Sequence, residues 1–162
     1  MPSPLIYGLI VAATMLDGFL AGTNVDRTLI QMPAWRQVGA RAWADYSRHA
    51  DLGPGLLLYP FMAIGGALLT VAAAIAFQVA GAAPRGAALP IFLAVALALG
   101  GLLATARAAP KMLSLRRIGN DPAALQAAFD GFEFWGNVRA VCQVLAFAAN
   151  VWALVAVLRG AA

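Results

Sequence analysis

Two ionisable side chains lie inside long apolar stretches of this 162-residue chain, where a charge is costly. Asp17 follows LIVAATML (9–16), and Arg139 precedes AVCQVLAFAANV (140–151). A carboxylate accepts protons, and a guanidinium stabilises an oxyanion that develops during a reaction. Together they are suited to acid–base chemistry on a substrate that is held away from water.

Each of these residues belongs to a polar stripe at helical spacing. Asp17 shares a helical face with Asn24, and Arg139 shares one with Trp135, Gln143 and Asn150. Polar stripes in a membrane face inward and pair with one another. We therefore expect an Asp17–Arg139 ion pair, direct or through water, beside a polar cavity between the first and last membrane spans. A pair that only fixes helix register is the alternative.

The composition identifies the elements that must position these residues. Hydrophobic residues make up 62% of the chain and charged residues 11%, and the mean hydropathy is +0.80. A soluble domain usually carries about a quarter charged residues, so the chain belongs to the membrane class. The net charge of +4 comes from scattered residues that flank apolar segments, which indicates contact with membrane lipid and not with nucleic acid.

Four apolar segments are long enough to cross a bilayer as helices. They predict an all-α fold, a transmembrane four-helix bundle that forms a single domain over residues 1–162. The expected spans are residues 4–28, 55–80, 87–109 and 133–158. Pro33 should end the first span, GAAPRG (81–86) should form a tight turn, and Asp121 with Pro122 should begin a helix.

The first long connection holds GARAWADYSRHAD (39–51), which predicts a short interfacial helix. Both long connections are rich in basic residues and lie on one side of the membrane. The positive-inside rule places them in the cytoplasm and both termini outside, in the cell membrane or the inner membrane of a two-membrane cell. The step Gly18-x-x-x-Gly22 favours close packing inside the bundle, with a homo-oligomer contact as the alternative.

The single histidine and the single cysteine exclude several kinds of site. Cys142 has no partner for an intramolecular disulfide, and no Cys/His spacing for a metal exists, so no metal site is expected. His49 lies near the predicted mouth of the bundle with Asp26, Arg27, Arg107 and Glu133. It is a second candidate for a catalytic base, because a histidine titrates near neutral pH.

Three segments resemble the anthrone-oxygenase-like (DUF1772) family of small membrane proteins. They are SRHADLGPGLLLYP (47–60), APKML (109–113) and FWGNVRAV (134–141), the last containing a W-x-N-x-R signature at Trp135, Asn137 and Arg139. The likeness covers nearly the whole chain. The chain departs from the family pattern at Met112, where an asparagine is often found.

The resemblance implies a monooxygenase that oxidises an anthrone-like polycyclic aromatic, or another hydrophobic small molecule, without a cofactor. Asp17 or His49 would be the base, and Arg139 would hold the oxyanion. The expected substrate-binding residues are Asn24, Tyr59, Trp135, Asn137 and Gln143, with Phe61 and Phe134 as further aromatic walls.

Two other functions remain open from the sequence. The segment WADYSRHADLGPG (43–55) also resembles the membrane styrene oxide isomerases, which implies a haem-binding isomerase or oxidoreductase with His49 as axial ligand. The third alternative is a non-enzymatic membrane binding or accessory protein. Transport is weaker, because neither an inverted repeat nor a pair of broken helices is apparent.

Overall fold

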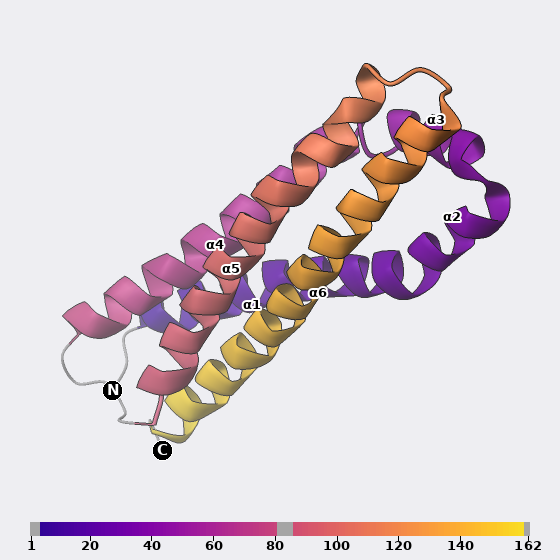
Figure 1. Cartoon of the computed structure of the whole chain (residues 1–162). Helices are drawn as coiled ribbons and strands as arrows, with labels where there is room; N and C mark the ends of the chain where they lie inside the picture. The colour runs from indigo at the N-terminus through magenta and orange to yellow at the C-terminus, as the bar shows by residue number, and fades with distance from the viewer. Residues whose placement is uncertain (1–3, 81–85, 161–162) are drawn as a thin grey trace.

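The computed structural model describes residues 4–80 and 86–160, and every regular element in these ranges is helical (Figure 1). The elements are α1 (Pro4–Asp26), the π-helical turn η1 (Arg27–Gln31), α2 (Met32–Val38), α3 (Ala40–His49), α4 (Gly55–Val79), α5 (Ala88–Leu113), the 3-10 turn η2 (Ser114–Arg116) and α6 (Pro122–Arg159). The predicted all-α class is confirmed. The turn predicted at 81–86 lies almost entirely outside the described residues.

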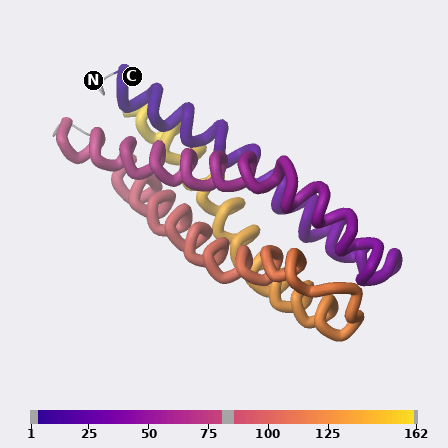
Figure 2. Tube along the Cα trace, turned by 90° about the horizontal axis from the view of Figure 1, so that it is seen from above, coloured from indigo at the N-terminus to yellow at the C-terminus, as the bar shows by residue number. Residues whose placement is uncertain are grey.

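Four long helices form an up-and-down bundle in which neighbours along the chain are also neighbours in space. α1 packs on α4 and α6, and α5 packs on the same two helices, most extensively on α6. Both ends of the described chain lie at one end of the bundle, and the long connections lie at the other (Figures 1 and 2). All four helices are long and apolar enough to span a membrane.

The second and third spans match their predicted ranges closely, whereas the first and fourth are longer than predicted. Pro33 does not end the first helix. It lies two residues after the π-helical turn η1, within a continuous helical run. The turn η1 carries the helix past this point, so the helical run extends from Pro4 to Val38.

α6 is a single helix of 38 residues, which is roughly 57 Å at 1.5 Å per residue. A hydrocarbon core is only about 30 Å thick, so about half of α6 extends beyond it. The Asp121 side chain accepts a hydrogen bond from the Ala123 backbone N–H, which confirms the predicted start. The apolar segment without charge runs from Ala140 to Leu158, and Arg139 therefore lies at the membrane edge.

The first and third spans carry charges at the same level. Asp26 ends α1, Arg27 begins η1, and Arg107 lies in the last turns of α5. These charges mark the membrane edge nearest the long connections. The predicted helix of the first connection is confirmed as α3, which begins after Gly39, the one described residue with a positive φ, +89°.

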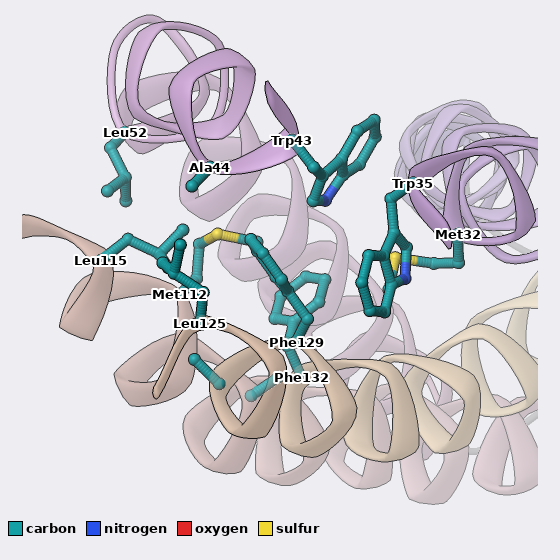
Figure 3. Packing of buried hydrophobic residues seen from close by; sticks show 12 residues of the cluster. Met32, Trp35, Trp43, Ala44, Leu52, Met112, Leu115, Leu125, Phe129 and Phe132 are labelled. Carbon is teal, nitrogen blue, oxygen red and sulfur yellow. The ribbon is translucent and has the colours of Figure 1, made fainter. Parts of the chain in front are cut away.

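The two ends of the bundle have different cores. Near the termini, small residues and a few larger ones pack closely, among them Ile10, Ala73, Ala153 and Val157. Near the long connections, α2, α3, α5 and α6 enclose an aromatic cluster around Trp35, Trp43, Phe129 and Phe132 (Figure 3). Trp35 and Phe129 are in contact, with ring centroids 5.2 Å apart.

Candidate functional site: a polar pocket at the membrane edge

Asp17 lies in a buried polar layer that joins α1, α4 and α6. The Asn150 side-chain amide donates to Asp17 Oδ2 at 2.7 Å, and the Thr70 hydroxyl lies 3.5 Å from the same oxygen. Asp17, Thr70 and Asn150 are all at least 96% buried. A Cβ on Gly66 would come within 2.7 Å of Asp17 Oδ1, so a glycine is needed there to make room for the carboxylate.

A second polar layer lies two helical turns nearer the long connections. The Asn24 amide nitrogen donates to Gln143 Oε1 and to the Leu20 carbonyl oxygen, the latter at 2.7 Å. Arg139 Nε donates to Asn24 Oδ1 at 2.9 Å. Asn24 therefore connects α1 to α6 twice, donating to Gln143 and accepting from Arg139.

The predicted direct Asp17–Arg139 ion pair is wrong. Asp17 contacts Asn150 and Asn24 contacts Gln143, so each step of seven residues along α1 matches seven residues along the antiparallel α6. In this register Arg139 lies level with position 28 of α1, about 16 Å beyond Asp17 along the axis. The prediction assumed that the ends of the first and fourth spans nearest the long connections are level, whereas the register is set by the side-chain contacts between the two helices.

A buried ion pair that the sequence did not predict joins η1 to the turn before α4. Arg27 donates from Nη1 to Asp51 Oδ1 at 2.6 Å and from Nη2 to Asp51 Oδ2 at 2.7 Å, which is bidentate geometry. The guanidinium carbons of Arg27 and Arg139 lie 5.1 and 5.6 Å from the centroid of the Phe132 ring. Arg27 thus has a carboxylate partner, and Arg139 has only neutral ones among the described residues.

These groups border a pocket of about 510 Å³. Leu20 and Gln143 line its deep end, and Gln31 and Asp51 line its outer end. From Leu20 to Gln31 the pocket follows about 16 Å of the helix axis. Its walls are mostly apolar, from Leu56 and Ala63 of α4 and Met112 of α5. All four spans contribute, so the expectation of a cavity between the first and fourth alone needs correction.

The structure brings four of the predicted site residues to this pocket and leaves four outside its lining. Asn24, Tyr59, Arg139 and Gln143 line it. The four outside are Asp17, which lies below the deep end, and His49, Trp135 and Asn137.

His49 and two of the three signature residues of α6, Trp135 and Asn137, lie outside the pocket lining. His49 is exposed at the end of α3, outside the lining of this pocket, and its Nδ1 lies 2.8 Å from the Asp45 carbonyl oxygen. Asn137 is exposed, and the Trp135 ring packs against Phe134 and under Arg107. Phe61 and Phe134 are 70% and 61% exposed, on the outer surface.

Several lining residues were absent from the predicted set. Asp51 and Gln31 belong to the first long connection, and Asp26, at its edge, was expected only at the mouth of the bundle and not among the site residues. Thr70, in the deeper layer, is the only hydroxyl inside the apolar run GGALLTVAAA (65–74), a signal that does single it out from sequence. For the described residues, no group of three or more potential metal ligands is found.

The fold and the pocket define a class: a four-span membrane protein with a polar-ended pocket at one membrane edge. Comparisons with protein-family models, with curated proteins and with solved structures give no match for this chain.

Proposed function

We propose that this chain binds a flat, hydrophobic weak acid in the pocket and oxygenates it without a metal or flavin, as an anthrone-oxygenase-like monooxygenase. The observation that carries this proposal is Arg139: its guanidinium lines a largely apolar pocket and hydrogen-bonds only to the neutral Asn24 among the described residues. Arg139 is half-buried; removing a cation from water without a counter-charge is costly, and an anionic ligand offsets that cost.

The comparison with Arg27 supports this role. Arg27 lines the same pocket, but both of its terminal nitrogens are bound to Asp51. Its charge is therefore neutralised within the protein, and its role is to hold η1 against the start of α4. Arg139 Nη1 and Nη2 have no protein partner in the described part of the chain, so they are free to donate to a ligand oxygen.

The shape of the pocket fits a small polycyclic compound that partitions into the membrane. Its volume lies within the range of about 300–1,000 Å³ that is usual for small-molecule sites. Its charged residues lie at the membrane edge, and its apolar walls extend inward. A ligand would therefore bury its rings between the helices and keep its acidic oxygen near the polar end.

Oxidation of an anthrone by O₂ balances in atoms and electrons without a cofactor. Removal of one C10 proton from an anthrone leaves an anion whose charge is delocalised onto the C9 oxygen, and Arg139 stabilises that oxyanion. The anion passes one electron to O₂, and the resulting radical and superoxide combine into a C10 peroxide. Protonation of the peroxide and loss of the second C10 hydrogen release water and leave a C10 carbonyl, so one oxygen atom enters the product.

The proposed function includes an orientation of the chain in the membrane. The chain lies in the cell membrane with both long connections in the cytoplasm, because their basic residues outnumber those at the opposite side. The pocket then opens toward the cytoplasmic leaflet. Arg27 is neutralised by Asp51 in a buried ion pair, so it does not count toward this excess. The excess comes from the remaining basic residues of the two connections, which are Arg36, Arg41, Arg48, Lys111, Arg116 and Arg117.

The binding test uses two fluorescent probes of similar shape, anthracene-9-carboxylate and the neutral 9-(hydroxymethyl)anthracene. Arg139→Gln should weaken carboxylate binding by about 10- to 100-fold, the range expected for a hydrogen bond to a charged group, and leave the neutral probe unchanged. Asn24→Asp should do the same by giving Arg139 a carboxylate partner. Arg36→Gln is the matched control, because Arg36 pairs with Glu133 outside the pocket.

The turnover test follows O₂ consumption and anthraquinone formation from anthrone by the purified protein in detergent micelles, with the rate in protein-free micelles subtracted. The proposal requires turnover that Arg139→Gln lowers. Probe binding without turnover would favour the non-enzymatic binding alternative. Equal affinity for both probes in wild-type and Arg139→Gln protein would refute the proposed site.

A further inference from the structure

Proton removal from the substrate needs a base in the pocket, and the structure narrows the choice among the nearby carboxylates. Asp17 lies below the deep end, bound to Asn150 and Thr70. Both Asp51 oxygens accept from Arg27. Glu133 is held by Arg36 and does not line the pocket. Asp26 is the remaining carboxylate in the lining.

We infer that Asp26 is the general base of the proposed reaction, an inference that rests on the proposed function. Asp26 Oδ2 accepts a hydrogen bond from the Gln31 amide at 2.6 Å, and Oδ1 has no partner among the described residues. Asp26 is half-buried, and its carboxylate has no cation within ion-pairing distance in the described part of the chain. One oxygen is therefore fixed and the other is free.

The π-helical turn explains how this carboxylate is held. In a π-turn the backbone bonds connect residues five apart, so positions 26 and 31 come close together. In an α-helix, by contrast, side chains three or four apart are the neighbours. The Gln31 amide thus reaches Asp26 from the other end of η1 and orients it. Single π-turns inside α-helices are frequent at functional sites.

The placement of Asp26 relative to Arg139 suits the proposed substrate. Asp26 comes from α1 and Arg139 from α6, so the pocket presents a base and a cation on different walls. In an anthrone the acidic CH₂ and the carbonyl oxygen lie on opposite edges of the middle ring. In the step assigned to Asp26, the C10–H bond breaks, the proton moves to Asp26 Oδ1, and the electron pair remains on the substrate as the anion beside Arg139.

The test measures this step apart from oxidation. Under argon in D₂O, proton NMR follows exchange of the C10 hydrogens of anthrone for deuterium, and O₂ uptake is measured separately in air. Asp26→Asn should lower both rates by about 10²- to 10⁴-fold, the usual contribution of a general base, and Asp26→Glu should retain part of them. Glu133→Gln, which removes a carboxylate at the same end of the bundle but outside the pocket, should leave both unchanged.

Binding of 9-(hydroxymethyl)anthracene confirms that each variant is folded, because this probe needs neither charge. Asp26→Asn should bind anthracene-9-carboxylate as tightly as wild type or more tightly, since it loses a negative charge near the ligand. Wild-type exchange no faster than in protein-free micelles, or unchanged exchange in Asp26→Asn, overturns the assignment. Failure of the pocket itself would appear differently, as loss of Arg139-dependent carboxylate binding.

Discussion

The two ends of the bundle are built from different residues and serve different purposes. At the end near the termini, alanines and a few larger apolar residues bring the helices together, and Ala153 and Val157 are fully buried. At the other end, tryptophans and phenylalanines pack between α2, α3, α5 and α6, and a buried ion pair joins η1 to the turn before α4. Small side chains let membrane helices approach closely, whereas bulky and polar ones hold them apart. The pocket lies at the second end, where the helices are held apart.

The largest effect should follow from breaking the Arg27–Asp51 ion pair. Arg27→Leu leaves Asp51 buried without its partner, and the free energy of unfolding should fall by about 3–5 kcal/mol. Detergent titration in mixed micelles, followed by tryptophan fluorescence, measures this change. The double variant Arg27→Leu/Asp51→Leu should recover most of the loss, because the uncompensated charge is gone. A double variant as unstable as the single one would show that the pair provides net stability.

Replacing one alanine at each end of the bundle by leucine should reveal the difference in packing between the two ends. Ala153→Leu inserts a side chain into the closely packed end and should cost about 1–3 kcal/mol of unfolding free energy, as overpacking does elsewhere. Ala63→Leu extends into the pocket, where there is room, and should cost less than about 1 kcal/mol. It should instead weaken binding of 9-(hydroxymethyl)anthracene. Equal costs at the two sites would mean that the pocket closes in solution.

A smaller effect is expected from Asp17, which lies between the two ends. Asp17→Leu leaves the Asn150 amide and the Thr70 hydroxyl without their acceptor, and side-chain hydrogen bonds between membrane helices contribute up to about 2 kcal/mol. Asp17→Asn keeps an acceptor and should cost less. Both variants should still bind anthracene-9-carboxylate, because Arg139 lies in the other layer. Loss of that binding in Asp17→Asn would show that the deep layer also positions the pocket.

The role of the buried Asp17 carboxylate thus differs from the role that the sequence predicted for it. An acidic residue in the middle of an apolar span predicted an ion pair with Arg139 and a role as catalytic base. In the structure Asp17 hydrogen-bonds to two neutral side chains below the pocket, and the layer it forms fixes the register of α1 against α6. The carboxylate positioned for chemistry is Asp26, nine residues further along the same helix.

The sequence by itself determined the four spans, the surface helix α3 and the inward direction of both polar stripes. These follow from length, composition and a 3.6-residue period, all of which are local properties of a helix. Four of the residues expected at the site line one pocket in the structure: Asn24, Tyr59, Arg139 and Gln143.

Only the tertiary structure decided which polar residues meet. Periodicity gives the direction of a side chain around its own axis, but it does not give the axial offset between two helices. That offset is set by side-chain packing along the whole interface, and here it pairs Asp17 with Asn150 and Asn24 with Gln143. It separates Asp17 from Arg139, brings Asn24 to Arg139, and closes the Arg27–Asp51 pair across the first connection.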